Sequence, residues 1–338
     1  MLKIAVLSLL GILGAHVSHG QQEKLKINGV NLVSINGLID STHVQPLKTL
    51  GANWAATIPF AFMPSPTSPD LSFDLEWQWK GERVDGVRNY IQELHTKGIS
   101  VMIKPQIWIG HGTYTGEIAM SSEADWLKLE ENYREYLLTF TRLAVEEKVE
   151  MICIGTELGQ FVENRPIYFR KLIKEIRSIY RGKLTYAANW DDFEAVTFWD
   201  DLDYIGVDAY FPISNKNKPS FHKLVDGWAP HKKKMDTLSK KFDRPILFTE
   251  YGYRSVAGCA AKPWDYSDSD KQDEKTQQYA LKALYHVFWN EDNYVGGFLW
   301  KWYPDHSNAG GADNKMFTVQ NKRAERLVRV VYGNSSNE

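Results

Sequence analysis

Residues 151–158 read MICIGTEL, and this stretch decides how the rest of the chain is interpreted. It begins with four apolar residues, two of them β-branched, which is typical of a buried strand. A Gly-Thr pair ends the run, and Glu157 then places a carboxylate at the carboxyl end of the strand. Residues 245–252, PILFTEYG, repeat this design and end the strand in Glu250. Two buried strands that each end in a glutamate are hard to explain by structure alone.

Short apolar runs alternate with amphipathic stretches along most of the chain. Residues 83–97 carry apolar side chains at helical spacing, and residues 124–147 carry a longer apolar stripe. A chain of 338 residues is an ordinary length for an α/β barrel. The pattern predicts eight strands, at residues 27–33, 53–58, 100–107, 151–156, 184–188, 204–208, 245–250 and 296–300.

These eight units show no break in composition between them, which favours the α/β class and a single (β/α)8 TIM barrel over residues 21–338. A doubly wound sheet is the alternative, but it gives no reason for eight units. Only about one turn of helix, at residues 192–199, separates the fifth and sixth predicted strands. Long loops, at residues 61–80, 110–122, 253–270 and 303–316, follow strand carboxyl ends, where barrel enzymes keep their sites.

The amino terminus has the pattern of a secretory signal peptide. Lys3 supplies a positive charge, residues 4–15 are almost wholly apolar, and residues 18–20 (SHG) are suited to cleavage. The apolar run is shorter than the about 20 residues that span a bilayer. We therefore expect residues 1–20 to be a signal peptide and the protein to be secreted or periplasmic, with an uncleaved anchor as the alternative. No other stretch is predicted to span a membrane.

Composition and missing motifs exclude several classes of function. A net charge of −2 with interspersed signs gives no support for binding nucleic acid or an anionic membrane. The nine histidines form no HxH or HExxH pattern, so no metal site is expected. Neither a glycine-rich phosphate loop nor a GxSxG motif is present, which argues against nucleotide binding and against an α/β-hydrolase esterase. No cofactor and no obligate protein partner are predicted.

The chain has two cysteines, too few for a disulfide framework. Cys153 lies within a predicted core strand and Cys259 in a predicted loop far along the chain. We expect one buried thiol and one loop thiol, although a disulfide between them remains the alternative.

Glu157 and Glu250 are the first candidates for catalysis. A buried carboxylate on a strand is costly unless it is paired or used, so a structural ion pair is the alternative for either one. Two carboxylates at matching strand ends favour function. Such a pair suits glycoside hydrolysis, in which one protonates the leaving oxygen and the other attacks the anomeric carbon. If so, the carboxyl groups should lie about 5–5.5 Å apart and the configuration should be retained.

Four motifs in order resemble glycoside hydrolase family 113, known for β-mannanases, within the clan of retaining (β/α)8 glycoside hydrolases. They are residues 154–158 (IGTEL), 206–212 (GVDAYFP), 249–255 (TEYGYRS) and 300–302 (WKW). The resemblance covers nearly all of the chain after residue 20. It implies a polysaccharide or oligosaccharide substrate, most directly β-1,4-mannan or glucomannan, and a mechanism that requires no metal or cofactor.

The resemblance also implies roles for the two glutamates: Glu157 as the acid/base and Glu250 as the nucleophile. Many members of the wider clan have Asn immediately before the acid/base, where its amide contacts the sugar 2-hydroxyl. Thr156 occupies that position here, which bears on the sugar that the site accepts.

Aromatic residues near strand ends are candidates for stacking on sugar rings. Trp300 resembles the platform that stacks on the sugar in the cleaved unit's subsite, and Trp302 shares its strand face by alternation. Trp108 follows the third predicted strand and Trp190 the fifth, where each could stack a sugar or cover a helix junction. Packing in the barrel core is the alternative for Trp300.

Polar residues near the same ends complete the predicted site. Tyr210 could donate a hydrogen bond to the nucleophile, and Asp208 could bind a sugar hydroxyl or pair with Lys104 across the barrel. Because a lysine within a strand is expensive unless matched, Lys104 is expected at the polar mouth. Asn31 and Asn189 are further predicted substrate contacts, with hydrogen bonds to the backbone as the alternative.

Two other functions remain open at this stage. The first is a non-catalytic glycan-binding barrel protein, which would have no need for two carboxylates at the cleavage position. The second is a retaining hydrolase of another β-linked substrate, such as a glucan or a xylan. New reducing ends after incubation with a glycan separate an enzyme from a binding protein.

Overall fold

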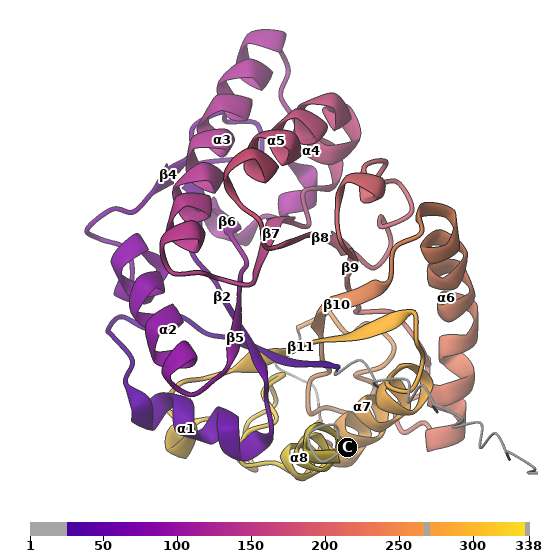
Figure 1. Ribbon diagram of the computed structural model, residues 1–338. Coiled ribbons are helices and arrows are strands. Elements are labelled where there is room, and N and C mark those ends of the chain that lie inside the picture. The colour runs from indigo at the N-terminus through magenta and orange to yellow at the C-terminus, as the bar shows by residue number, and fades with distance from the viewer. Residues whose placement is uncertain (1–25, 267–270, 335–338) are drawn as a thin grey trace, which may run out of the picture.

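Eight parallel strands form a closed barrel in the computed structural model, which describes residues 26–266 and 271–334 (Figure 1). Their order around the barrel is β1-β11-β10-β9-β8-β7-β5-β2. The predicted (β/α)8 TIM barrel is therefore confirmed. The strands are β1 (Ile27–Leu32), β2 (Trp54–Thr57), β5 (Ser100–Ile103), β7 (Met151–Thr156), β8 (Lys183–Asn189), β9 (Ile205–Asp208), β10 (Ile246–Tyr251) and β11 (Tyr294–Trp302).

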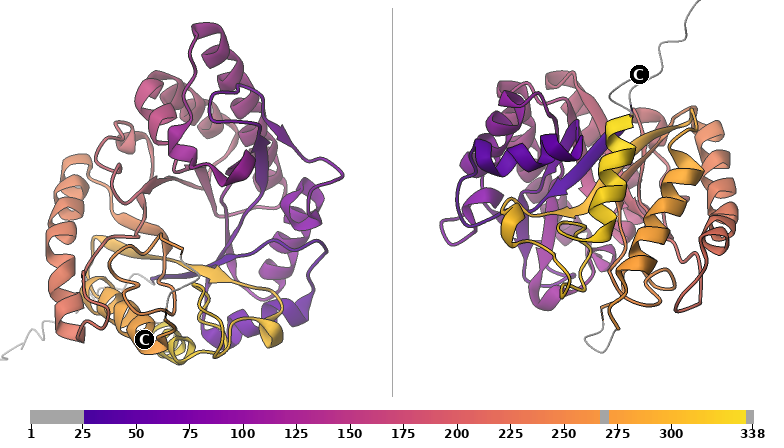
Figure 2. Two further views of the ribbon diagram at one scale, coloured as in Figure 1. Left: turned by 180° about the vertical axis from the view of Figure 1, so that it is seen from behind. Right: turned by 90° about the horizontal axis from the view of Figure 1, so that it is seen from below.

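Helices surround the barrel on the outside, as the views from behind and from below also show (Figure 2). Between β8 and β9, where the sequence predicts only about one turn at residues 192–199, the chain forms the short 3-10 helix Trp199–Asp201 and no α-helix. The helices are α1 (Ser41–Leu50), α2 (Val84–Thr96), α3 (Glu123–Glu146), α4 (Gly159–Asn164), α5 (Pro166–Ile179), α6 (Phe221–Phe242), α7 (Glu274–Phe288) and α8 (Arg323–Asn334).

Polar side chains just before several helices fix where those helices begin. Asp40 accepts a hydrogen bond from the backbone of Thr42 at the start of α1, and Ser122 accepts one from Asp125 at the start of α3. Such caps satisfy amide groups that have no partner within the helix. At the other end of α1, Gly51 adopts a left-handed conformation with φ of 87°, which a glycine allows without strain.

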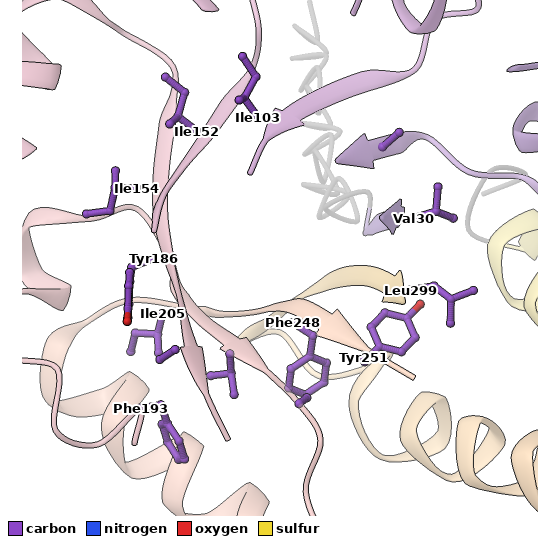
Figure 3. Packing of buried hydrophobic residues seen from close by; sticks show 14 of the residues in the cluster. Val30, Ile103, Ile152, Ile154, Tyr186, Phe193, Ile205, Phe248, Tyr251 and Leu299 are labelled. Atoms are coloured by element: carbon purple, nitrogen blue, oxygen red, sulfur yellow. The ribbon is translucent and has the colours of Figure 1, made fainter. Parts of the chain in front are cut away.

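The strands alternate between two apolar layers. On β7, Met151 and Cys153 point into the barrel and belong to a small cluster that also contains Phe298. Ile152 and Ile154 point outward and pack in the larger core between strands and helices, part of which Figure 3 shows. Because both faces are covered, the strand is apolar at successive positions instead of alternating with polar residues.

The predicted strand at residues 100–107 is wrong as a single element. The chain leaves the barrel at Pro105, and a separate strand, β6 (Gln106–Ile109), follows. The same happens at Pro59, after which β3 (Phe60–Met63) begins. Proline has no N–H to donate to a ladder, so both strands stop pairing within the barrel at these positions. The other barrel strands match their predicted bounds within two residues.

β3, β6 and the short β4 (Ser72–Phe73) form a second sheet, called the rim sheet below, in the order β4-β3-β6. Figure 1 shows β4 and β6 next to α3. Residues 61–80, predicted as a loop, therefore contain strand structure. Tyr136 of α3 fixes the sheet to the barrel, because its hydroxyl donates to the carbonyl oxygens of Pro59 and Gln106 at 2.9 and 3.1 Å.

The predicted signal peptide, residues 1–20, lies outside the described residues. Within residues 26–266 and 271–334, no helix is both long enough and apolar enough to cross a membrane.

Candidate active site

A pocket of about 150 Å³ opens near the carboxyl ends of the barrel strands. It brings together Glu157, which follows β7, and Glu250, which lies near the end of β10. The sequence placed both glutamates at strand ends, and the closed barrel puts those ends at one mouth. The complete lining is Gln106, Ile107, Thr115, Thr156, Glu157, Glu250 and Trp300.

Three donors hold the carboxylate of Glu250. Lys104 Nζ and Gln106 Nε2 both donate to Oε1, the latter at 3.2 Å. The hydroxyl of Tyr210 donates to Oε2 at 2.6 Å. Because both oxygens have partners, the carboxylate is fixed in orientation, as an attacking group requires. The predicted contact between Tyr210 and Glu250 is present in the structure.

Lys104 and Asp208 form the charged support beneath Glu250. Both side chains are fully buried, and Lys104 Nζ lies 3.7 Å from Asp208 Oδ2. Burial alone would lower the pKa of Lys104, but the charges of Asp208 and Glu250 raise it above its usual value. Lys104 is therefore a cation that serves both carboxyl groups.

Only one of the two carboxylate oxygens of Asp208 forms a hydrogen bond within the described part of the chain. Thr249 Oγ1 donates to Oδ1 at 2.7 Å, whereas Oδ2 has no hydrogen-bond partner among the described residues. Burial, followed by the charge of Glu250, raises the pKa of Asp208 to about 8. This carboxyl group therefore binds a proton far more readily than an exposed aspartate does.

Glu157 sits in a left-handed backbone conformation with φ of 52°. This conformation costs a non-glycine residue roughly 1–2 kcal/mol, so the surroundings must hold it in place. The backbone N–H of Glu157 donates to Ala187 O at 2.8 Å, and its carbonyl oxygen accepts from Thr115 Oγ1 at 3.1 Å. The next amide, of Leu158, donates to the hydroxyl of Tyr186 at 2.8 Å. These contacts aim the Glu157 side chain into the pocket.

The pKa of Glu157 is raised well above its usual value. Burial is the largest cause, followed by the negative charges of Asp208 and Glu250. A carboxyl group in this setting holds its proton more tightly than an exposed glutamate does. The two glutamates therefore differ in environment: Lys104, Gln106 and Tyr210 donate to Glu250, whereas Glu157 feels mainly burial and the negative charges of Asp208 and Glu250.

Of the two tryptophans on β11, Trp300 lines the pocket, with Lys104 Nζ 5.8 Å from the centre of its ring. Trp302 is fully buried and stacks parallel on His306 with ring centres 5.2 Å apart. Trp302 thus packs in the core and does not line the pocket, although alternation predicted a shared face.

The other two predicted stacking residues lie away from the pocket lining. Trp108 is on β6 of the rim sheet and is 52% exposed. Trp190 is half-buried and stacks on Trp264, with ring centres 4.8 Å apart and planes 17° from parallel.

The two predicted asparagine contacts have different surroundings. Asn31 is fully buried, and its amide donates to the carbonyl oxygens of Thr249 and Phe298, both at 3.2 Å. Asn189 is half-buried and donates to the hydroxyl of Tyr114 at 2.8 Å and to Asp191 Oδ1 at 3.0 Å.

A second pocket, of about 250 Å³, lies beside the first. Tyr114, Gly159 and Asp192 are among its lining residues. Burial, followed by the charge of Asp191, raises the pKa of Asp192 to about 7. The two pockets are neighbours because Thr115 lines the first and Tyr114 and Gly116 line the second.

Sequence reasoning missed three residues that line the pocket: Gln106, Ile107 and Thr115. Gln106 touches the nucleophile candidate directly, and Thr115 holds the backbone of Glu157. Strand alternation offered a signal for Gln106, because it lies two residues before Trp108 and so shares its face. No comparable signal marked Thr115, which lies in a long loop.

The described residues contain no group of three or more His, Cys, Asp or Glu arranged to hold a metal ion. Cys153 and Cys259 are both free and both buried. Thr156 lines the pocket, and its hydroxyl donates to Pro105 O at 3.3 Å.

Three of the solved structures that share this fold are glycosidases. The β-mannanase AaManA of family 113 from Alicyclobacillus acidocaldarius superposes with a TM-score of 0.80, at 23% identity over 92% of this chain and 98% of that one. A second β-1,4-mannanase of the same family gives 0.78, at 21% identity over 91% and 99% of the two chains. A β-glucuronidase from Faecalibacterium prausnitzii gives 0.61 at 15% identity, over 92% of this chain but only 49% of that one.

No protein of curated function matches the sequence significantly. The sequence model of Glycoside Hydrolase Family 113 matches residues 40–322. This range is most of the chain and contains every barrel strand but β1. The match confirms the resemblance that the four motifs indicated. The chain is therefore a glycoside hydrolase that belongs to family 113.

Proposed function

We propose that the protein is a retaining β-mannanase that cleaves β-1,4-mannan or glucomannan by double displacement. The observation that carries this proposal is the pairing of Glu157 and Glu250 in one pocket with opposite electrostatic settings. The names of two structural neighbours, a β-mannanase and a β-1,4-mannanase, support the choice of substrate.

In the first step Glu250 attacks the anomeric carbon, the glycosidic bond breaks, and the proton of Glu157 passes to the leaving oxygen. In the second step Glu157 takes a proton from water, whose oxygen attacks the same carbon and releases Glu250. The raised pKa of Glu157 suits the donor role, because a carboxyl group that holds its proton to a higher pH is better able to deliver it to the leaving oxygen.

The groups around Glu250 have a positioning role in this mechanism. Tyr210 and Gln106 hold the two carboxylate oxygens, and Lys104 supplies the balancing positive charge. Trp300 offers an aromatic face at the edge of the pocket for the sugar ring that is cleaved.

A substrate panel tests the reaction class. Incubation with mannan, glucomannan, cellulose and xylan should yield new reducing ends with mannan or glucomannan in excess over the others. Faster cleavage of cellulose or xylan would replace the mannanase proposal with another β-glycanase. Binding of a glycan without new ends would support a non-catalytic protein.

Substitution of the two glutamates tests their roles. Glu157→Gln and Glu250→Gln should each lose nearly all activity while the fold, followed by circular dichroism, stays intact. Azide should restore turnover to Glu250→Ala and give a glycosyl azide of inverted configuration, because azide replaces the missing nucleophile. Near-parental turnover by either Gln variant would contradict the assignment.

We also propose that the protein is exported from the cytoplasm. The apolar run at residues 4–15, preceded by Lys3, supports this proposal. Expression of the full chain in a secreting host should give an extracellular or periplasmic product that begins near Gln21, and amino-terminal sequencing checks it. A cytoplasmic product that retains residues 1–20 would contradict the proposal.

A further inference from the structure

The rim sheet has one buried face and one face with a row of partly exposed side chains. Along β3 and β6 the exposure alternates: Ala61, Met63, Ile107 and Ile109 are buried, whereas Phe60, Phe62 and Gln106 are half-buried and Trp108 is exposed. Strand alternation therefore puts Phe60, Phe62, Gln106 and Trp108 on the same face.

This face begins at the reaction centre. Gln106 Nε2 donates to Glu250 Oε1, so the residue at the start of β6 already contacts the nucleophile. Trp108 lies two residues further along, about 6.6 Å away at the usual rise of a strand. Phe62 pairs in register with Trp108 on the neighbouring strand, about 4.8 Å to the side.

Trp77 extends the same surface. Its ring meets that of Phe62 edge-on, with centres 4.6 Å apart. Trp77 is 61% exposed, more than any other tryptophan of the chain. Gln106, Trp108, Phe62 and Trp77 thus form a continuous line, called the aromatic strip below, that leads outward from Glu250.

The aromatic strip is held rigidly in place. Buried Gln78, next to Trp77, donates to Phe60 O at 3.0 Å and accepts from Leu75 N at 2.8 Å. The first bond fastens the turn that carries Trp77 to β3, and the second closes the turn itself. Tyr136 fastens the other end of the sheet to α3 through the carbonyl oxygens of Pro59 and Gln106. A surface already fixed in this way loses little entropy when a ligand binds.

We propose that the aromatic strip binds the continuing polysaccharide chain beyond the sugars next to the cleaved bond. Exposed aromatic rings in a row suit a ligand with a repeating ring, because each pyranose face presents C–H groups to a π-cloud. The continuity with Gln106 identifies the occupant as the same chain that enters the pocket. The aromatic strip would therefore contribute to the binding of long substrates and not of short ones. This inference rests on the proposed function.

Affinity for a long chain provides the test. Native electrophoresis through gels that contain soluble glucomannan measures binding without turnover when the variants carry Glu157→Gln. Trp108→Ala and Trp77→Ala should each weaken binding by about three- to tenfold, the loss expected for one aromatic contact. Trp108→Phe should retain most of the affinity, because a flat ring remains.

Kinetics separate the strip from the catalytic pocket. In the otherwise unchanged enzyme, Trp108→Ala should raise KM for glucomannan and leave kcat/KM for a short chromogenic β-mannoside unchanged. Ile179→Ala serves as the control, since Ile179 is an exposed apolar residue at the end of α5, which leads to the amino end of β8. It should change neither value.

The binding and kinetic results together test whether the aromatic strip binds the distant part of the glycan. Parental affinity in both Trp77→Ala and Trp108→Ala would overturn the inference while leaving the proposed cleavage intact. Equal losses on the short and the long substrate would also overturn it, because the strip would then belong to the cleaved sugars. If the parent cleaves no glycan but Trp108→Ala still loses affinity for glucomannan, the proposed cleavage fails and the aromatic strip is a surface that binds glycan without turnover.

Discussion

The ammonium group of Lys104 and the carboxylate of Glu250 form an ion pair in which the lysine is fully buried and the glutamate side chain is 7% exposed. Asp208 lies on the other side of the same ammonium group, so one cation serves two carboxyl groups. Removing two charges from water is costly, and the attraction between them offsets this cost only while both partners remain. The pair therefore links the stability of the barrel to the reaction at its mouth.

Loss of Lys104 should destabilise the fold. Lys104→Met keeps most of the volume but leaves two buried carboxyl groups without a cation, and the free energy of unfolding should fall by about 3–5 kcal/mol. Urea denaturation measures the change. Lys104→Met/Glu250→Gln should recover part of the loss, because the carboxylate to which Lys104 donates is then a neutral amide. A single variant as stable as the parent would refute the account of this pair.

Loss of the Tyr210 hydroxyl should affect activity more than stability. Tyr210→Phe removes the donor to Glu250 Oε2 and leaves the ring in contact with Phe317, whose centre lies 5.8 Å away. A hydrogen bond to a charged group contributes about 1.5–3 kcal/mol, so kcat should fall roughly ten- to hundredfold. Kinetics on glucomannan and a thermal melt check both parts. Unchanged kcat would show that Tyr210 does not position the nucleophile.

Asp208 should extend activity toward alkaline pH. The pKa of Glu157 is raised by burial and then by the charge of Asp208, whose own pKa is about 8. When Asp208 ionises, its charge makes Glu157 keep its proton to a higher pH. Asp208→Asn removes this charge, so the alkaline limb of kcat/KM should move to lower pH. A limb that stays in place, or moves upward, would contradict the coupling.

Gly206 on β9 should tolerate no side chain. A Cβ there would lie 2.1 Å from Tyr186 O and 2.5 Å from Thr185 Oγ1, and the backbone oxygen belongs to the neighbouring strand. Gly206→Ala should therefore lower the free energy of unfolding by about 1–3 kcal/mol. Gly333→Ala, where a Cβ meets nothing within 4 Å, is the matched control and should be nearly neutral. Equal melting temperatures for the two variants would refute this expectation.

The barrel and its catalytic pair were predictable because both follow from local pattern. Buried strands such as β7 can be recognised by their apolar runs. Eight such strands with helices between them are compatible with few fold classes. A glutamate at the end of such a run is unusual for a buried strand, which is why Glu157 and Glu250 stood out. Lys104 stood out for the same physical reason.

The rim sheet was not predictable in the same way. Residues 61–80 are rich in proline and serine, and β4 contains only Ser72 and Phe73. The break at Pro105 splits a run that reads as one strand, because apolar residues lie on both sides of the break, at 101–103 and at 107–109. Proline ends the pairing within the barrel, but the new pairing of β3 with β6 joins distant segments, and such pairing leaves little trace in a single sequence.

Positions near strand ends were also poorly determined. Alternation predicted one face for both tryptophans of β11, yet Trp300 lines the pocket and Trp302 packs against His306. Asn31 lies on β1, as predicted, but its amide donates to the backbone oxygens of Thr249 and Phe298. Side-chain burial at such positions depends on contacts from other strands, which spacing alone does not specify.

The central claim is that Glu250 acts as a nucleophile and Glu157 as its acid/base in a double displacement. The most direct test is the anomeric configuration of the first product, followed by proton NMR during cleavage of a β-linked manno-oligosaccharide. The account predicts that the β-anomer forms first and then mutarotates. Initial formation of the α-anomer would show inversion and would contradict it.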